Sequence, residues 1–340
     1  MIILGIETSC DETAAALVKD GRQVLRSTVA SQLAVHRPFK GVVPELASRA
    51  HVERINQVIE EACGKVGKRT IDAIAVTTGP GLVGCLLIGT VTARALGWAW
   101  GVPVIGVNHL EGHLFAGLVE HPRLTPPFLG LIVSGGHTEL VIFRGYGRYT
   151  KLGATRDDAA GEAFDKVSNL LDLPFPGGPS IDRAARKGNP SAVDFPRAWI
   201  AGTADFSFSG LKTAVANYLH STPMKKRVSV PDIAASFQEA VVDVLVKKTL
   251  CAARTHHLCS IVVGGGVAAN SRLRTAFQKA ARQENMSLYL PDLSFCTDNA
   301  AMIAAAGYYK QKQGFSSKGK LAVNANLEIQ SWSRAHAYAR

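Results

Sequence analysis

Ile2-Ile-Leu-Gly-Ile-Glu-Thr8 is the stretch that decides the fold. Small polar residues follow it at 9–12, and an apolar run continues from 13 to 18, which predicts a strand, a tight turn and a second strand. The pattern returns 125 positions later, where Leu129-Gly-Leu131 repeats Leu4-Gly-Ile6. Two copies of one hairpin predict a chain built from two similar halves.

A second correspondence joins two strands that each run into a glycine-rich turn and a helix. Ile74-Ala-Val76 leads to Gly79-Pro-Gly81, and Ile261-Val-Val263 leads to Gly264-Gly-Gly266. Such turns let backbone N–H groups and a helix N-terminus face an anion. We therefore expect a duplicated α/β fold with mixed sheets, and a ligand cleft where the two halves meet.

Apolar residues spaced for one helix face predict three helices. The first covers residues 44–66, and the second runs from its cap, Asp232, to about residue 254. Asp298 is expected to cap the third. The region 204–231 is expected to be rich in loops and carries the basic triplet Lys225-Lys-Arg227.

The composition of the 340 residues, 47% hydrophobic and 19% charged, is that of a folded chain. The net charge is +11, with most of the excess in residues 307–340 and in the 225–227 triplet. This balance indicates an anionic partner, with solvated surface as the plain alternative. Six cysteines without a CxxC pair favour free thiols in the cytosol.

No membrane segment or leader is expected from the sequence. The most apolar stretch, residues 86–107, is interrupted by Arg94 and Pro103, so we expect a buried helix followed by a strand. The first residues are apolar without a basic region before them, which is unlike a signal peptide. A cytoplasmic location is expected.

His109-Leu-Glu-Gly-His113 is the signal for a metal. Positions four apart share one helix face, so both imidazoles could bind one ion, although such a pair also occurs by chance. Glu111 lies roughly 200° around the helix from either histidine, which argues against a zinc peptidase, where Glu directly follows the first His. Asp298 is the candidate third ligand, unless it is only a helix cap. Two imidazoles and one carboxylate suit Fe(II) and Zn(II).

Three further polar segments could bind a ligand or be merely structural. Residues 157–166 place acidic side chains on one side of a helix, either for a ligand or as an ion-paired helix start. Residues 174–182 hold two glycines between prolines, and Asp182 is expected to open a helix there. Residues 206–212 form either a simple turn or a segment that sets Lys212 near a phosphate. Neither a nucleophilic triad nor a GxxxxGK loop is present in the sequence.

Eight motifs stand in the order of one family. They are Glu7-Thr-Ser-Cys-Asp-Glu-Thr13, Val42-Val-Pro-Glu-Leu-Ala-Ser-Arg-Ala-His51, Gly79-Pro-Gly81, Asn108-His-Leu-Glu-Gly-His113, Ser134-Gly-Gly-His-Thr138, Asp158-Ala-Ala-Gly-Glu-Ala-Phe-Asp-Lys166, Gly264-Gly-Gly-Val-Ala-Ala-Asn270 and Thr297-Asp-Asn299. The chain resembles the TsaD family, the bacterial tRNA N6-adenosine threonylcarbamoyltransferases, from residue 2 to about residue 310. Lys40 and Cys85 stand where the family usually has Gly and Ala, and the tail after Gln313 matches poorly.

The resemblance implies both a fold and a reaction. The fold is the duplicated actin-like, sugar-kinase-like (ASKHA) α/β architecture, with one subdomain at 1–127 plus 299–325, a second at 128–298, and a tail at 326–340. The reaction moves a threonylcarbamoyl group from threonylcarbamoyl-AMP to N6 of the adenosine 3′ of the anticodon in tRNAs that read ANN codons.

The resemblance also implies site residues. A metal is expected on His109, His113 and Asp298, with Fe(II) first and Zn(II) as its rival. The adenylate substrate is expected at Ile132, Val133, Ser134, Gly135, Gly136, Asp165, Gly178, Asp182 and Asn270. From their place on the turn facing the cleft, and not from the resemblance, Asp11 and Glu12 are candidates for assisting removal of the amine proton.

The expected partners are tRNA, threonylcarbamoyl-AMP, a smaller homologue without the metal pair (TsaB) and an accessory ATPase (TsaE). The basic segments would then contact tRNA phosphates. Two other functions fit the same architecture. An ATP-dependent small-molecule kinase would bind Mg²⁺ through carboxylates and water rather than imidazoles. A nucleotide-binding scaffold without chemistry of its own would not need the metal residues.

Overall fold

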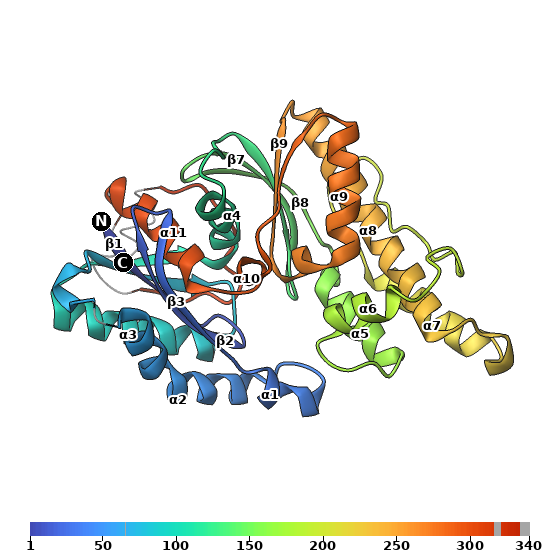
Figure 1. Cartoon of the computed structure of the whole chain (residues 1–340), viewed down its shortest axis with the longest axis horizontal. Coiled ribbons are helices and arrows are strands. Elements are labelled where there is room, and N and C mark those ends of the chain that lie inside the picture. The colour runs from blue at the N-terminus through green and yellow to red at the C-terminus, as the bar shows by residue number, and fades with distance from the viewer. Residues whose placement is uncertain (65, 316–320, 334–340) are drawn as a thin grey trace. The chain divides into compact units, whose positions relative to one another are not determined.

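The computed structural model describes residues 1–64, 66–315 and 321–333. The chain divides into two compact units (Figure 1). Unit 1 comprises residues 1–126, 145–149 and 297 onward, and unit 2 comprises residues 127–144 and 150–296. Unit 1 thus takes in Asp298 and residues 145–149, which the sequence places in the second subdomain. It also takes in the described residues 326–333, which the sequence places in a tail.

Unit 1 is built on a five-stranded mixed sheet with the order β3-β2-β1-β4-β5. Its strands are β1 (Ile2–Glu7), β2 (Glu12–Lys19), β3 (Gln23–Ser31), β4 (Ala73–Gly79) and β5 (Val104–Asn108). The first three pair antiparallel, whereas β1, β4 and β5 are parallel. Every residue of β4 is buried, as expected for a strand covered on both faces.

Helices cover both faces of this sheet (Figure 1). The helices of this unit are α1 (Leu33–His36), α2 (Pro44–Cys63), α3 (Val83–Trp100), α4 (His109–Glu120) and α11 (Ala300–Lys312), with 3-10 turns at Arg37–Phe39 and Lys68–Thr70. Leu4 and Ile6 share a core with α2 and α3, whereas Gly5 faces α11. A Cβ on Gly5 would lie 2.1 Å from the Ala300 carbonyl oxygen, so α11 packs directly on the strand because this residue is glycine.

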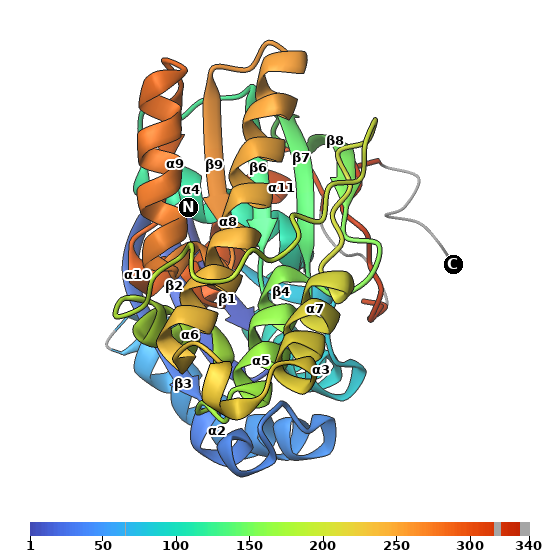
Figure 2. The ribbon, with the colours of Figure 1, turned by 90° about the vertical axis from the view of Figure 1, so that its right-hand side faces the viewer.

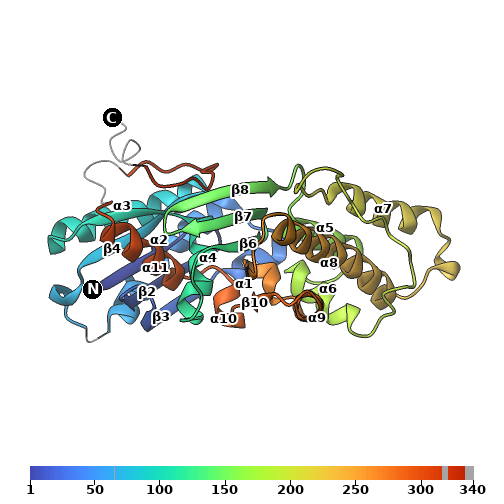
Figure 3. The same ribbon diagram turned by 90° about the horizontal axis from the view of Figure 1, so that it is seen from above.

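Unit 2 holds a second five-stranded sheet with the order β10-β9-β6-β7-β8 (Figure 2, Figure 3). Its strands are β6 (Phe128–Val133), β7 (Thr138–Gly145), β8 (Arg148–Ala154), β9 (Ser260–Gly264) and β10 (Ser287–Tyr289). Its helices are α5 (Ala160–Leu170), α6 (Gly177–Ala185), α7 (Ser209–Ser221), α8 (Val230–Thr255), α9 (Ser271–Gln283) and α10 (Leu293–Cys296), with 3-10 turns at Met224–Lys226 and Gly266–Ala269.

The two sheets repeat one connectivity. In unit 1, β1 pairs antiparallel with the next strand and parallel with β4; in unit 2, β6 does the same with β7 and β9. The register matches as well, because Leu4 lies opposite Ile74 and Leu129 lies opposite Ile261. The predicted duplication and the mixed-sheet α/β fold are confirmed.

Two helix caps differ from the prediction. The side chain of Ser229 accepts a hydrogen bond from the Asp232 N–H and caps α8, so Asp232 lies in the first turn. The side chain of Asn299 accepts from the Met302 N–H and caps α11, so Asp298 lies just outside that helix. The predicted caps Asp232 and Asp298 are wrong by three residues and one residue, respectively.

Three other local predictions also need correction. The region 204–231 contains α7 (Ser209–Ser221). The N–H groups of its N-cap residue Phe208 and of Ser209 donate to the Asp157 carboxylate. Helix α6 begins at Gly177, so Asp182 lies within it rather than at its start. The sequence predicts that helix α3 is buried, but it is only partly buried, because it packs on the sheet along one side. Its length and composition alone would allow a membrane span, as they do for core helices of soluble proteins.

Candidate functional site

Helix α4 carries both histidines of the predicted metal motif. It begins at His109 because the side chain of Asn108 accepts hydrogen bonds from Leu110 N at 2.9 Å and Glu111 N at 3.3 Å. One turn separates His109 from His113, and their ring centroids lie 4.7 Å apart. Both side chains are buried. The predicted helix therefore brings two imidazoles to one place.

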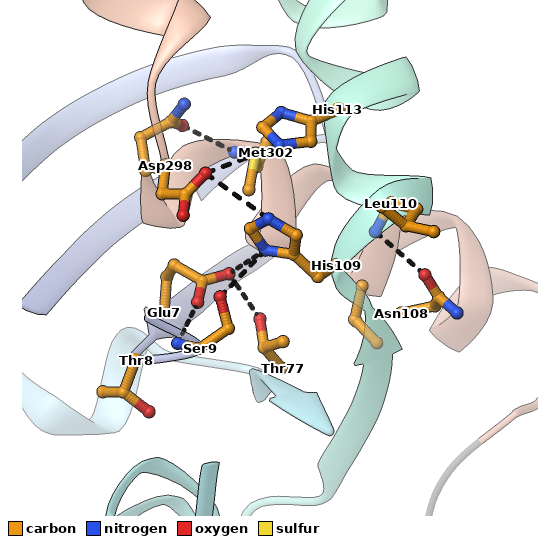
Figure 4. Close-up of polar contacts among 12 residues, drawn as sticks. Glu7, Thr8, Ser9, Thr77, Asn108, His109, Leu110, His113, Asp298 and Met302 are labelled. Carbon is orange, nitrogen blue, oxygen red and sulfur yellow. Dashed lines mark hydrogen bonds and ion pairs between the residues drawn. The ribbon is translucent and has the colours of Figure 1, made fainter. Parts of the chain in front are cut away.

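Asp298 meets these imidazoles from the segment that leads into α11 (Figure 4). Its Oδ1 lies 3.4 Å from the Nε2 of His109 and 3.4 Å from the Nε2 of His113. One candidate ligand atom from each of the three residues lies within 4.8 Å of the other two. Because Asn299 caps α11, the Asp298 carboxylate is left for the histidines.

The chemistry of these donors fits a divalent metal ion. Apart from the 3.4 Å approach of Asp298 to Nε2, neither ring nitrogen of the buried His113 has a hydrogen-bond partner within the described part of the chain. A buried imidazole without such a partner is costly, and a metal bond to Nε2 would compensate for it. Donor atoms bound to one ion at roughly 2.1 Å lie about 3–3.5 Å from each other, which the 3.4 Å separations match. Unit 1 thus contains a candidate His-His-Asp metal site.

Glu7 orients His109 from the opposite side of the ring. Its Oε2 lies 2.9 Å from the His109 Nδ1 and accepts a 2.7 Å hydrogen bond from the Thr77 hydroxyl. Its Oε1 accepts from Ser9 N at 2.5 Å, and the Ser9 hydroxyl lies 3.2 Å from the same imidazole nitrogen. An Nδ1–H donated to Glu7 leaves Nε2 for a metal. Sequence reasoning missed this role, although a charged residue closing a buried strand is a recognisable signal.

The charges of this cluster favour a cation. Burial opposes the charged form of His109, yet Asp298 and Glu7 together hold its pKa well above the usual value. Burial likewise acts against the Glu7 carboxylate, but His109 lowers the pKa of Glu7 below its usual value. Burial lowers the pKa of His113. Two carboxylates around two imidazoles therefore stabilise positive charge at the place where the metal is expected.

Asp11 and Glu12 lie on the turn between β1 and β2 and at the start of β2. The carbonyl oxygen of Asp11 accepts from Gln32 N at 3.0 Å, and that of Cys10 lies 2.9 Å from the His51 Nε2, so the turn is held in place. Burial, together with the nearby Asp11 and Asp298, raises the pKa of Glu12 to about 10. With that pKa, Glu12 holds a proton near neutral pH.

The predicted phosphate turns lie at the ends of strands in unit 2. Ile132 and Val133 end β6 and are fully buried, so only their backbone could reach a ligand. Nothing lies within 4 Å of where a Cβ would stand on Gly135 or Gly136, so the turn after β6 is open beside its backbone. The Ser134 carbonyl accepts from Gly161 N at 3.1 Å, which fixes the turn against the start of α5.

Asp165 and Asp182, two of the predicted adenylate residues, each accept a hydrogen bond from another segment of unit 2. Asp165 on α5 accepts from Gly177 N at 2.6 Å, which brings it beside Gly178, where a Cβ would again meet open space. Asp182 on α6 accepts from the Ser271 hydroxyl at 2.7 Å, so it lies next to the turn that holds Asn270.

Asn270 itself is engaged within the protein. Its Oδ1 accepts from Leu273 N and caps α9, and its Nδ2 donates to Gln238 at 2.7 Å. An amide group has a second N–H on Nδ2 and a second lone pair on Oδ1. Support for the turn therefore does not prevent a contact with the adenylate.

Several other predicted groups have structural partners. Lys166 lies 2.6 Å from Asp158 and 2.9 Å from Glu162, the arrangement of an ion-paired helix start. In the basic tail, Lys310 donates to the Gly106 carbonyl at 2.9 Å, and Lys318, Lys320, Arg334 and Arg340 lie outside the described residues. Arg227 of the basic triplet donates to the Thr222 carbonyl at 2.8 Å.

Comparison with known proteins agrees with the motifs. A family model described as TsaD, tRNA N6-adenosine threonylcarbamoyltransferase, matches residues 23–305. The chain is 53% identical over 330 residues to the tRNA N6-adenosine threonylcarbamoyltransferase of Geobacillus thermodenitrificans (strain NG80-2), covering 95% of each chain. It is 51% identical over 333 residues to that of Clostridioides difficile (strain 630), covering 97% of this chain and 98% of the relative.

A solved structure supports the architecture alone. The crystal structure of HypF from T. kodakarensis superposes with a TM-score of 0.64 at 14% identity, over 92% of this chain and 48% of that one. The duplicated mixed-sheet fold is the actin-like, sugar-kinase-like architecture that the motifs predict. The chain belongs to the TsaD family of tRNA N6-adenosine threonylcarbamoyltransferases.

Proposed function

We propose that this chain transfers a threonylcarbamoyl group from threonylcarbamoyl-AMP to N6 of the adenosine 3′ of the anticodon in tRNAs that read ANN codons. Family membership supports transfer to a tRNA adenosine and argues against the kinase and the scaffold. The observation that carries the chemistry is the convergence of His109, His113 and Asp298.

We assign Fe(II) to these three residues, with Zn(II) as the rival, because two imidazoles and a carboxylate suit both ions. When bound, such an ion supplies Lewis-acid polarisation of a carbonyl or phosphoryl oxygen. Glu7 holds the His109 ring so that its Nε2 is directed at Asp298. His113 is buried, and the residues packed around α4 hold its side chain in place.

The donor would be bound by unit 2. We propose that the backbone N–H groups of residues 134–136 and 264–266 hold its phosphate, because successive N–H groups in such turns bind anions without a full charge. Gly178 leaves space beside the backbone for the nucleoside, and Asp182 accepts hydrogen bonds next to the turn at Asn270. In this proposal Asp182 orients the donor, and the glycines that have open space beside their backbone leave room for it to bind.

The acceptor amine must lose a proton. Its nitrogen forms a bond to the carbamoyl carbon, the bond from that carbon to the AMP phosphate oxygen breaks, and AMP leaves with the electron pair. An exocyclic adenine amine is a poor nucleophile, so positioning contributes much of the rate. We propose Asp11 as the proton acceptor. Glu12, with its raised pKa, is proposed to act as a neutral hydrogen-bonding group.

The partners follow from the same reaction. We propose that the exposed Lys225 and Lys226 contact tRNA phosphates, and that the chain works in the cytoplasm with a smaller homologue and an accessory ATPase. Val83, Leu87 and Val91 are exposed along one side of α3. An apolar surface of this kind supports a protein partner.

The test is replacement of His109 and His113 by Ala, separately and together. Purified chains are given threonylcarbamoyl-AMP and a tRNA transcript, and the modified nucleoside is measured by mass spectrometry. We expect loss of bound metal and of modification with unchanged circular dichroism. His220→Ala, on an exposed position of α7, is the matched control. Modification that persists in the metal-free double variant would remove the metal from the proposal. In a parallel incubation with ATP and a small hydroxyl compound, a phosphorylated product would indicate a kinase.

A further inference from the structure

The described residues 321–333, which we call the C-terminal strap, lie beyond the matched family region and contain neither helix nor strand. The strap packs along the rest of unit 1 and makes backbone hydrogen bonds to it. Asn324 N donates to the Thr78 carbonyl at 2.9 Å, and the Ala325 carbonyl accepts from Gly81 N at 3.2 Å. A Cβ on Gly79 would lie 2.0 Å from the Asn324 carbonyl oxygen, so the strap fits closely against the end of β4.

The strap also reaches the start of the metal helix. The side chain of Asn108 caps α4 with its Oδ1, while its Nδ2 donates to the Leu327 carbonyl at 3.2 Å and the Glu328 carbonyl at 3.0 Å. One residue therefore links the strap to the first turn of the helix that carries His109.

A second link is made on the opposite side of α4, at Glu111. This carboxylate is 1% exposed and lies roughly 200° around the helix from either histidine. The hydroxyl of Tyr149 and the indole N–H of Trp332 in the strap both donate to Oε1 of Glu111, and the ammonium group of Lys310 lies 3.5 Å from its Oε2. Three separate segments thus converge on one buried carboxylate.

The Trp332 ring is itself fixed in place. A Cβ on Gly147 would lie 2.2 Å from this ring. The backbone N–H of Trp332 donates to the Gly147 carbonyl at 2.8 Å. The Ser331 hydroxyl exchanges hydrogen bonds with the backbone of Tyr149, which brings the strap beside the start of β8 (Figure 3). The donors to Glu111 are therefore held by backbone contacts.

We propose that Glu111 is a positioning residue, and that Tyr149 and the strap residue Trp332 use it to fix the rotation of α4 and so align both imidazoles for the metal. An atom about 5.5 Å from a helix axis moves by about 2 Å when the helix turns by about 20°. This shift is as large as a metal–nitrogen bond. Bonds to the face opposite the ligands resist such a rotation.

The inference rests on the proposed metal site, so the experiment measures metal binding separately from transfer. Cobalt(II) serves as the probe, because its visible absorption reports the geometry of the bound ion. Its affinity is measured by titration of the full-length chain in the wild type, in Trp332→Phe, in Tyr149→Phe and in the double variant. Trp199→Phe in unit 2 is the control for the same chemical change.

We expect the double variant to bind cobalt about tenfold more weakly, at the lower end of the effects of outer-shell groups, with a changed visible spectrum. The control should stay within about twofold of the wild type. Glu111→Gln, which keeps an acceptor for both donors, should lose less affinity than Glu111→Leu. Excess metal should restore tRNA modification in the double variant, which a loss of fold would not allow.

Two failures are distinguishable. If the wild type binds no cobalt, the metal part of the proposed function fails. If the wild type binds it and the double variant binds with the same affinity and spectrum, the positioning role is refuted. Trp332→Phe alone keeps the ring against Gly147 and decides the matter should the double variant not fold.

Discussion

Asp298 and Asn299 are adjacent residues with separate tasks, and substitutions there should separate metal binding from helix stability. Asp298 Oδ1 lies 3.4 Å from both imidazoles, while Asn299 Oδ1 accepts from Met302 N at 3.1 Å. We predict that Asn299→Ala lowers the free energy of unfolding by about 1 kcal/mol, the usual contribution of an N-cap, without changing metal affinity. Asp298→Asn should weaken metal binding and leave the cap intact.

The magnitudes follow from the linkage between binding and folding. A ligand present at 100 times its dissociation constant stabilises the native state by about 2.7 kcal/mol. The wild type and Asn299→Ala should both gain this amount on addition of metal, the variant from a baseline about 1 kcal/mol lower. If Asp298→Asn binds about 100-fold more weakly, its gain at the same metal concentration is only about 0.4 kcal/mol.

The assay is urea unfolding of each protein with and without metal. The free energy of unfolding is taken from the transition whose midpoint shifts when metal is added to the wild type. Asp194→Asn, at a fully exposed position of unit 2, controls for the change from carboxylate to amide. A full metal-dependent gain in Asp298→Asn would show that Asp298 is not a ligand. Loss of the gain in Asn299→Ala would show that capping and metal binding are not separate.

Four further outcomes can be measured. Glu7→Gln should weaken metal binding about 10- to 100-fold in a chelator competition, because Glu7 orients an imidazole through its Nδ1. Asp157→Ala should lower the urea unfolding free energy by about 1–2 kcal/mol, because Asp157 accepts the N–H groups of Phe208 and Ser209 at the start of α7. Burial lowers the pKa of His51, so on acidification the unfolded chain takes up this proton first. The unfolding free energy should therefore fall as the pH drops below about 6.5, and His51→Gln should flatten that slope. Replacing Lys225 and Lys226 by Gln should make the salt dependence of tRNA binding shallower, by up to about 0.9 in the logarithmic slope per lost phosphate contact, with donor binding unchanged.

The duplication was predictable because each copy is a local pattern. A strand, a tight turn and a glycine-rich strand end are each formed by residues close together in sequence. The hairpin repeats 125 positions later, whereas the strand that starts at Ile74 repeats at Ile261, so each copy is found by comparing short segments. The register of Leu4 with Ile74 and of Leu129 with Ile261 shows that matched residues occupy matched places in the two sheets. Repetition in the sequence therefore translated directly into repetition in the fold.

The helix caps were less predictable for a physical reason. Ser, Asp and Asn are all good N-caps, and each mispredicted helix start offers more than one of them. At α11, Asp298 and Asn299 are neighbours, and helix propensity does not choose between them. The choice is made by tertiary contacts, because the histidines engage Asp298 and leave Asn299 to the helix.

The metal site shows the same division between local and distant information. The spacing of His109 and His113 follows from the helix period, so two ligands could be read from five residues. Asp298 comes from a segment far along the chain, and no spacing rule connects it to them. Its place at a predicted helix start made it a candidate with a helix cap as the alternative, the family resemblance favoured the ligand, and the structure shows how the chain brings it to the imidazoles.

The bonds that hold the ligands in place are more distant still and have no local signature. Glu7 and His109 are 102 positions apart, and Glu111 and Trp332 are 221 apart. An imidazole is useful to a metal only when its ring is oriented, and that orientation comes from the second nitrogen and from the rotation of its helix. The five-residue motif therefore specifies which atoms bind, whereas the end of β1 and the C-terminal strap determine where those atoms point. A site defined by its motif alone would omit both Glu7 and Trp332.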